Sequence, residues 1–436
     1  MDPRQKTSSE TDNEVQIVGG VLPDGTLLEL VKSADRPDGL DLMRSDGTHA
    51  TIAPRFEVGN RIYRPIDLSA DIVRAVNFPV SPADYGTTQE LVDRVATFLD
   101  RHTGLGCADS RLAAFFVLAS WFPEVGPVTL LTSSNFIAEA PSLLRALRGL
   151  CRHGLLVADL NTKRFRSLPL TLTPTIILDQ TNVSYPLADL LRVSNTPELF
   201  VENNGSLVSL NCFQVVCTGQ SELDPSLTER MLRVALGPLR PDARILDRDA
   251  AAEILTDLQP RLLAYRIRNF ARVNASHFDV AEFPLAFREI ARSLGAAIVD
   301  DEVLKQEVAS LLSPRAEEAR AQSVLKPEYG IVLVVLNYLH DRYQKCIAVS
   351  VLAAAVNAVP RSFGEIVEFS ATEIGQRLAA LGLYTSRTAN AKVVRLNRET
   401  SRKAHELARR LGVPLPEGGF PDCPDCGASP QAVGKS

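Results

Sequence analysis

The feature that most constrains the fold is an alternation of apolar strand and amphipathic helix within residues 128–182. Residues 128–131 form a short apolar run, and residues 142–151 have the apolar periodicity of an amphipathic helix. A second apolar run, within residues 175–180, reads as a buried strand that ends in the carboxylate of Asp179 and is followed by Gln180. Strands that alternate with helices build a parallel sheet covered by helices, so the pattern predicts an α/β core.

The connection between the first strand and its helix lacks the residues of a phosphate-binding loop. Such a loop has a glycine-rich turn and then Lys and Ser or Thr opening a helix, which together cradle phosphates. Residues 132–141, between the strand and the helix, contain no glycine and no lysine, but they do contain Glu139 and Pro141. A carboxylate repels triphosphate, and a proline removes an N–H from the cradle. The sequence therefore predicts the outline of a nucleotide-binding core without the groups that hold the nucleotide.

The order of elements from residue 85 to 240 resembles the AAA-type ATPase domain of bacterial and phage helicase-like or primase-associated P-loop proteins of mobile elements. The motifs behind this resemblance are two helices ending in Ser-Trp-Phe-Pro, the strand–helix pair above, and the strands at 174–179 and 214–219. The resemblance implies that Asp179 is the Mg²⁺ carboxylate, that Thr218 is near a sensor position, and that Arg230 reaches a neighbour's nucleotide. When residues 142–145 are aligned with the start of the family's loop helix, the glycine positions fall on Ser134 and Glu139, the lysine on Ala140 and the hydroxyl on Pro141. Gln180 stands where a second acidic residue, a base or a water-orienting carboxylate, is usual. The resemblance thus implies a degenerate ATPase, with ATP and Mg²⁺ as the alternative cofactors.

Patterning divides the chain into seven parts. A polar tail and a run of short strands split by Pro-Asp-Gly and Ser-Asp-Gly turns precede the core, and charge-rich helices follow it. The parts are a flexible tail (1–14), a small β domain (15–68), a helical lead-in (69–125), the degenerate ATPase-like core (126–240), a helical lid (241–328), a winged helix-turn-helix (329–416) and a tail with a CxxC motif (417–436). Within the lid, Arg266 and its neighbouring arginines flank aromatic residues, which suits either a nucleic-acid grip or a solvated helix face.

The winged domain is predicted from three helices followed by a hairpin. Residues 329–342, 349–357 and 370–381 read as helices, and Ser370 with Glu373 forms a capping box. Residues 370–412 carry nine Lys or Arg and three Glu, a net charge of +6 in a chain of net charge -5. This segregation favours duplex DNA over a protein partner. The candidate DNA-binding residues are Arg377, Arg387, Lys392, Arg395, Arg398, Arg402 and Lys403.

The C-terminal tail contains one pair of potential zinc ligands. Cys423 and Cys426 have the spacing of a zinc knuckle, which supplies two of the four tetrahedral ligands. The other two would have to come from a distant residue or another chain, and a vestigial tail is the alternative. Four other cysteines lie in apolar segments and are predicted to be reduced core thiols: Cys151, Cys212, Cys217 and Cys346.

Composition limits the class of protein. With 45% hydrophobic and 23% charged residues the chain is typical of soluble proteins, and it contains neither an apolar run long enough to span a membrane nor the apolar core of a signal peptide, which predicts a cytoplasmic protein. The favoured function is a non-catalytic, helicase-like DNA-binding or scaffold protein of a mobile-element or phage-derived locus. It would act with further copies of itself or with a partner ATPase or replication protein. The alternatives are an active DNA-dependent ATPase with an unusual phosphate site, and a transcriptional regulator.

Overall fold

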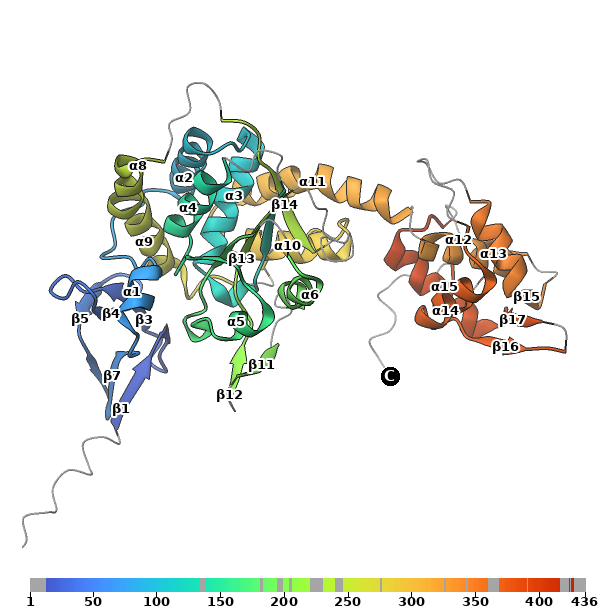
Figure 1. Ribbon diagram of the computed structural model, residues 1–436, viewed down its shortest axis with the longest axis horizontal. Coiled ribbons are helices and arrows are strands. Elements are labelled where there is room, and N and C mark those ends of the chain that lie inside the picture. The colour runs from blue at the N-terminus through green and yellow to red at the C-terminus, as the bar shows by residue number, and fades with distance from the viewer. Residues whose placement is uncertain are drawn as a thin grey trace, which may run out of the picture. The chain divides into compact units, whose positions relative to one another are not determined.

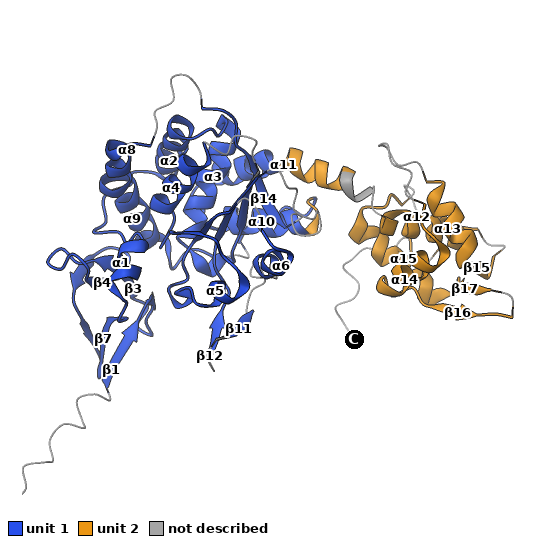
Figure 2. Ribbon diagram, viewed as in Figure 1, with its two compact units in different colours: residues 1–282, 286–312 blue, residues 283–285, 313–436 orange. Residues whose placement is uncertain are grey.

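A computed structural model describes most of the chain, and the described residues divide into two compact units (Figure 2). The first unit comprises residues 1–282 and 286–312, and the second comprises residues 283–285 and 313–436. The described residues are 13–133, 139–180, 183–193, 199–203, 206–219, 230–239, 246–274, 277–324, 327–341, 344–359, 368–389, 391–415, 423, 425 and 426.

Two small sheets form the N-terminal part of the first unit (Figure 1). One is four-stranded and antiparallel, in the order β2 (Gly19–Val21), β3 (Leu27–Lys32), β4 (Leu40–Ser45) and β5 (Ala50–Ala53). The other has the order β1 (Glu14–Ile17), β7 (Arg61–Pro65) and β6 (Phe56–Val58). The predicted small β unit is confirmed; the pairs β2–β3, β3–β4, β4–β5 and β6–β7 are antiparallel, whereas β1 pairs with β7 in parallel.

The core is a five-stranded sheet in which every strand pair is parallel. The strands are β8 (Thr129–Ser133), β9 (Leu155–Ala158), β10 (Ile176–Asp179), β13 (Gln214–Thr218) and β14 (Met231–Ala235). Their order across the sheet is β14-β8-β13-β10-β9. The predicted α/β class with a parallel core is therefore confirmed.

Helices cover both faces of this sheet. The chain crosses from β8 to β9 in one direction through α4 (Ala140–Leu150) and returns to β10 through α5 (Thr162–Arg166) and to β13 through α6 (Tyr185–Val193). Since parallel crossovers are right-handed, opposite directions place α4 on one face and α5 and α6 on the other. Phe165 of α5 and Leu187 of α6 pack with the alternate sheet residues Leu131, Leu178 and Val216.

Further helices surround the core. Beside α4 lies α2 (Thr88–His102), whose N-cap Thr87 makes a capping box with Glu90, and α2 packs on α3 (Cys107–Ser120). Trp121, at the end of α3, is buried, and its indole N–H donates to the Leu150 carbonyl at 2.9 Å. The remaining elements are α1 (Ala70–Ala75), the 3₁₀ turns Pro123–Val125 and Leu170–Leu172, the hairpin β11 (Phe200–Asn203) and β12 (Ser206–Ser209), α8 (Arg248–Glu253), a π-turn (Ile254–Leu258), α9 (Gln259–Asn269), α10 (Leu285–Ala296) and α11 (Glu302–Val324).

No helix in the described ranges is both long enough and apolar enough to cross a bilayer.

A buried ionic network ties the N-terminal sheet to the core. Glu29 of β3 accepts from Arg152 Nε at 2.9 Å and from Arg266 Nε at 2.7 Å, and the side chains of Glu29 and Arg266 are each 1% exposed. Burial would raise the pKa of Glu29, but the two guanidinium charges lower it to about 2. Arg266 Nη1 also donates to the Trp121 carbonyl at 2.5 Å. Three segments distant in sequence thus meet at one carboxylate.

The second unit has winged-helix topology. Its elements are α12 (Pro327–His340), β15 (Cys346–Ala348), α13 (Val349–Asn357), α14 (Ala371–Ala380), β16 (Thr385–Arg387), β17 (Lys392–Arg395) and α15 (Arg398–Leu411). The antiparallel sheet has the order β15-β17-β16, so β16 and β17 form the predicted hairpin. Ser370 and Glu373 make the expected capping box on α14. The helices enclose an apolar core that includes Val335, Leu352 and Leu378.

Candidate functional site

The carboxyl edge of the parallel sheet has the topology of a ligand-binding edge. The connection from β8 passes β13 and β10 to reach β9, whereas the connection from β13 passes β8 to reach β14. Two adjacent strands therefore lead away in opposite directions, and open α/β sheets bind ligands outside the strand ends at such a point. At this point β13 is followed by Gly219, and β8 is followed by the segment that aligns with a phosphate-binding loop but lacks its glycines and lysine.

Helix α4 begins at this edge, at the residues that align with the end of a phosphate-binding loop. The side chains at these positions differ from those of such a loop. Ala140 is the first residue of α4 and is 2% exposed, so a buried methyl group stands at the lysine position. Glu139 is the N-cap residue and makes no capping hydrogen bond with its side chain, and Pro141 lies in the first turn. Ser134, at the first glycine position, falls outside the described residues. A carboxylate therefore lies at the helix end where a phosphate would be favoured.

Asp179 and Thr218 lie at the same carboxyl edge of the sheet. Asp179 ends β10 opposite Cys217 of β13, and Thr218 is the next residue along that strand. Asp179 is exposed whereas Thr218 is only 4% exposed. Gln180 follows Asp179, and its Oε1 accepts from the Leu160 backbone N–H at 2.8 Å. The amide of Gln180 thus binds the chain beyond β9.

Arg230 is placed elsewhere. It is exposed and directly precedes β14, whose first residue, Met231, pairs with Thr129 at the start of β8. Arg230 is therefore at the amino edge of the sheet, away from Asp179 and Thr218. Within one chain the structure brings together Asp179, Gln180 and Thr218 and leaves Arg230 at the other edge.

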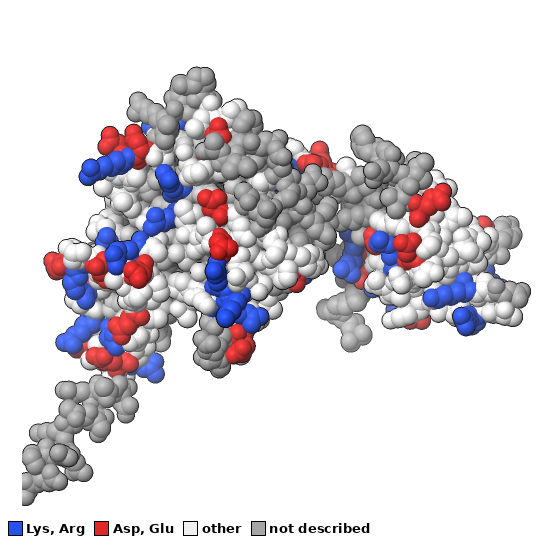
Figure 3. Space-filling model, viewed as in Figure 1, with Lys and Arg blue, Asp and Glu red and all other residues white. Residues whose placement is uncertain are grey.

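The basic residues of the winged unit separate into free and engaged groups. Four of the candidate DNA-binding residues are exposed and have neither an ion pair nor a side-chain hydrogen bond among the described residues: Arg387, Lys392, Arg398 and Arg402. In contrast, Lys403 pairs with Glu406 at 3.1 Å, and Arg395 Nε donates to Ser386 Oγ at 3.1 Å. On the face seen in Figure 3, basic side chains gather over the wing strands β16 and β17.

Arg377 differs from the four free candidates because its guanidinium already pairs with a carboxylate of the protein. It lies on α14, where its guanidinium pairs with Glu328 and lies over the Phe369 ring at 5.2 Å. No other Lys or Arg lies on α14, whose exposed residues are Ala371, Thr372, Glu373, Gln376, Ala379 and Ala380. Among the candidate DNA-binding residues, the free positive charge therefore belongs to the wing and to the start of α15.

The two tail cysteines meet two histidines that sequence reasoning did not identify. His340, Cys423, Cys426 and His405 place their ligand atoms within 4.8 Å of one another. Cys426 Sγ lies 3.2 Å from His405 Nε2 and 3.3 Å from His340 Nε2, and Cys423 Sγ lies 3.5 Å from His405 Nε2. Partial burial, and then the charge of His405, lower the pKa of His340, which favours a neutral imidazole. The only sequence signal was that a lone CxxC needs two more ligands.

The other cysteines follow the prediction with one correction. Cys151, Cys212 and Cys217 are buried, and burial raises the pKa of the first two thiols to about 12. Burial, with the charge of Asp179, raises the pKa of Cys217 to about 11. Cys346 is exposed, so its prediction as a core thiol was wrong. It lies on β15, a three-residue strand of which only Ile347 is buried.

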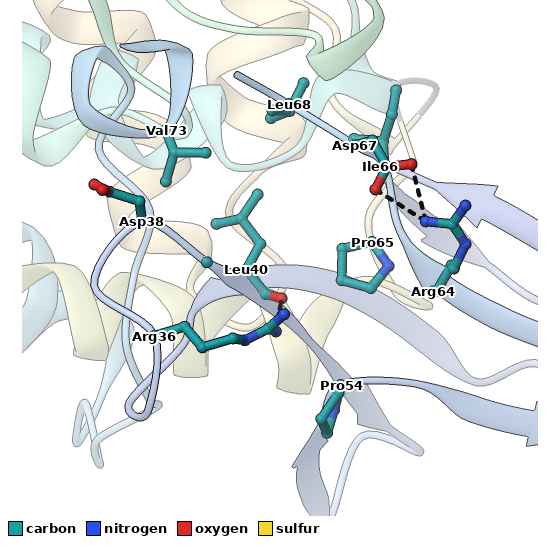
Figure 4. Close-up of a pocket in the computed structure, with 11 residues that line it drawn as sticks. Arg36, Asp38, Leu40, Pro54, Arg64, Pro65, Ile66, Asp67, Leu68 and Val73 are labelled. Atoms are coloured by element: carbon teal, nitrogen blue, oxygen red, sulfur yellow. Dashed lines mark hydrogen bonds and ion pairs between the residues drawn. The ribbon is translucent and has the colours of Figure 1, made fainter. Parts of the chain in front are cut away.

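Two other candidate regions do not favour ligand binding. Arg266 is buried in the ionic network, and Arg261 and Arg268 pair with Asp257 and Asp84, so these three arginines of the lid stretch are engaged within the protein. A cavity of about 260 Å³ lies in the N-terminal part and is lined by eleven residues, among them Arg36, Arg64 and Val73 (Figure 4). Its arginines are engaged within the protein, since Arg36 pairs with Asp41 at 2.6 Å and Arg64 pairs with Asp67 at 2.9 Å.

Comparisons with known proteins show distant structural similarity only. Neither a protein-family profile nor a curated protein matches the sequence. The A-form apo structure of the NrS-1 C-terminal region matches with 9% identity and a TM-score of 0.37, over 84% of this chain and 96% of that chain. A full-length MCM homolog from Methanopyrus kandleri matches with 12% identity and a TM-score of 0.41, over 69% and 75%. The class that the strand order and contacts define is a mixed α/β protein with a parallel core and a winged-helix unit.

Proposed function

We propose that this chain is a non-catalytic, helicase-like DNA-binding protein whose winged unit contacts the duplex and whose α/β core is a scaffold. The observation that carries the proposal is the set of four exposed basic side chains on the wing and on α15. We also propose that the chain comes from a mobile-element or phage-derived locus. In the same proposal, it assembles with further copies of itself or with a partner ATPase or replication protein.

The wing geometry supports contact with the DNA backbone more than reading of bases. Arg387 and Lys392 face each other across the hairpin, as partners in the β16–β17 register. Arg398 and Arg402 follow on the first turns of α15. Because α14 lacks free basic residues, the positive surface is suited to phosphates, and phosphate contacts position a protein without specifying sequence. We therefore expect strong salt dependence and weak sequence preference.

The core supports the non-catalytic part of the proposal. Ala140 cannot neutralise phosphate charge, Pro141 lacks an N–H and a hydroxyl, and the N-cap residue, Glu139, carries a negative charge. Gln180 has no carboxylate and is hydrogen-bonded to the chain. One acidic residue, Asp179, remains at the sheet edge, and a single exposed carboxylate with no lysine nearby in sequence is weak support for nucleotide binding.

Duplex binding at several salt concentrations tests the DNA proposal. Each phosphate contact that is lost lowers the slope of log K against log salt by about 0.9, so Arg387→Ala with Lys392→Ala should reduce it by about 2. The matched control is Arg55→Ala with Arg101→Ala, two exposed arginines of the first unit with no partner among the described residues. An unchanged slope in the wing variant would show that the wing is not the DNA surface.

A nucleotide titration tests the core. We expect no saturable ATP binding with Mg²⁺ in the wild-type protein. Measurable affinity that disappears in Asp179→Ala would overturn the scaffold assignment and favour the active ATPase. Retention of one promoter fragment among many would favour the regulator.

A further inference from the structure

The strongest feature outside the proposed DNA surface is the cluster of His340, His405, Cys423 and Cys426 in the winged unit. Tetrahedral zinc, with Zn–S near 2.3 Å and Zn–N near 2.0–2.1 Å, places sulfur and nitrogen ligands about 3.6 Å apart. The three sulfur–nitrogen distances here are 3.2, 3.3 and 3.5 Å. Two thiolates with two imidazoles are the donor set that zinc prefers.

The environment of the cluster orients the ligands. His405 Nδ1 lies 2.7 Å from the Ser401 carbonyl, which can only accept, so Nδ1 carries the proton and Nε2 presents its lone pair to the cysteines. The Cys426 backbone N–H donates to the Cys423 carbonyl at 3.3 Å, which closes the turn between them. The cysteine loop is therefore folded with both sulfurs toward Nε2.

A second set of contacts fastens this loop to α15. Ser401 Oγ donates to Asp425 Oδ2 at 2.7 Å, and Arg409 Nη2 donates to the Asp425 carbonyl at 2.8 Å. Asp425 lies between the two cysteines, so α15 holds their loop from two positions. A ligand set with polar support of this kind is a built site and not a chance meeting of side chains.

We propose that these four residues form a closed structural zinc site that joins the C-terminal tail to α12 and α15. Binding replaces the protons of the two thiols, which go to solvent, and leaves both histidines neutral. All four coordination positions are protein side chains, so no position remains for substrate and the role is structural. The site is independent of the proposed DNA function.

The winged unit does not need the metal to form its core. The packing of α12, α13, α14 and α15 buries Ile331, Leu352, Leu378 and Ala408 completely without involving the cysteines. Zinc then fixes the tail and the α12–α15 pair. Variants that lose the metal should consequently stay folded, which keeps the test informative.

The test is metal analysis of the full-length protein under reducing conditions. We expect one zinc per chain, competition with a chromophoric chelator, and with Co²⁺ the visible spectrum of a tetrahedral site with two thiolates. Cys423→Ser with Cys426→Ser should abolish stoichiometric binding, and His405→Gln should weaken it at least about tenfold. Far-UV circular dichroism checks that each variant is folded.

Matched controls are available on the same chain. Cys107→Ser with Cys346→Ser removes two exposed thiols, and His277→Gln removes an exposed imidazole, and neither should change the metal content. The proposal is overturned if the reduced wild-type protein binds neither zinc nor Co²⁺, or if the double cysteine variant keeps one zinc per chain. A Cys423–Cys426 disulfide that cycles while the reduced form binds no metal would identify a redox pair instead.

Discussion

Replacing Glu29 with Gln should be among the most destabilising single changes in the first unit. The substitution keeps the shape of the side chain and removes the carboxylate charge that Arg152 and Arg266 share, leaving Glu124, 3.1 Å from Arg266, as the remaining carboxylate of the network. Both guanidinium groups are buried, with side-chain exposures of 5% and 1%. A buried charge left without its partner costs about 3–5 kcal/mol.

The pKa of Glu29 gives a second estimate of the same quantity. Although burial raises it, Arg152 and Arg266 lower it from 4.5 to about 2, and a shift of this size corresponds to about 3 kcal/mol. Because the folded-state pKa is lowered, this stabilisation is fully present above about pH 4.5 and is lost as the pH falls through about 2. The difference in unfolding free energy between wild type and Glu29→Gln should therefore shrink over that range.

Fluorescence of Trp121 is the assay, because Trp121 is the only tryptophan of the chain and its carbonyl accepts from Arg266. Urea unfolding of wild type and Glu29→Gln at neutral pH should differ by about 3 kcal/mol or more. Asp67→Asn, which breaks an exposed ion pair with Arg64, is the control and should cost less than about 1 kcal/mol. A loss below 1 kcal/mol in Glu29→Gln, or a difference that does not change with pH, would refute the role given to the network.

Three further changes test other parts of the structure. Arg377→Gln should leave duplex affinity and its salt slope unchanged, because that guanidinium already pairs with a carboxylate of α12; a loss equal to that of the wing variant would place α14 on the DNA. Thr87→Ala removes a capping box and should lower the unfolding free energy by about 1 kcal/mol in urea titration. Gly295→Ala brings a Cβ to 2.2 Å from the Phe278 ring and should cost about 1–3 kcal/mol, whereas Gly330→Ala, with its nearest atom at 3.4 Å, should be neutral or stabilising in thermal unfolding.

Local signals in the sequence predicted the elements that have strong boundaries. The strand at 128–131 and the helix at 142–151 appear as Thr129–Ser133 and Ala140–Leu150. The capping box at Ser370 was predicted to start a helix, and it does. These positions depend on apolar periodicity and on caps that act within a few residues.

Pairing between distant segments was not predictable in the same way. The parallel pair of β1 and β7, and the place of β8 between β14 and β13, depend on which strand edges meet in the folded chain. Strand β9 (Leu155–Ala158) was not predicted, because four residues after a helix give little periodicity. Glu29 and Arg266 likewise look like ordinary surface charges in sequence, and only the packing of β3 against α9 and the core makes them a buried pair.

A local sequence motif identified two of the four proposed zinc ligands. Cys423 and Cys426 are recognisable from their spacing, whereas His340 ends α12 and His405 lies within α15. No spacing rule joins these histidines to the cysteines. Their meeting follows from the packing of α12 on α15, which buries Ala404 and Ala408. The two histidine ligands could therefore be identified only from the tertiary structure.

Helix α15 carries both a proposed metal ligand, His405, and part of the proposed DNA surface. The question is whether loss of the metal would change DNA binding. His405 lies three residues after Arg402 and seven after Arg398, so the three share one side of the helix. The helix is nevertheless anchored without metal, since Ala404 and Ala408 are completely buried in the apolar core. Loss of zinc should consequently leave the basic side chains in place.

The two properties should therefore separate in one pair of variants. Cys423→Ser with Cys426→Ser should lose zinc and keep the salt slope of duplex binding, while Arg398→Ala with Arg402→Ala should keep zinc and lower that slope by about 2. If the cysteine variant stays folded but its slope falls as far as that of the arginine variant, the apolar core is not sufficient to hold α15. The metal would then set the geometry of the DNA surface, because the position of the first two turns of α15 would depend on zinc binding.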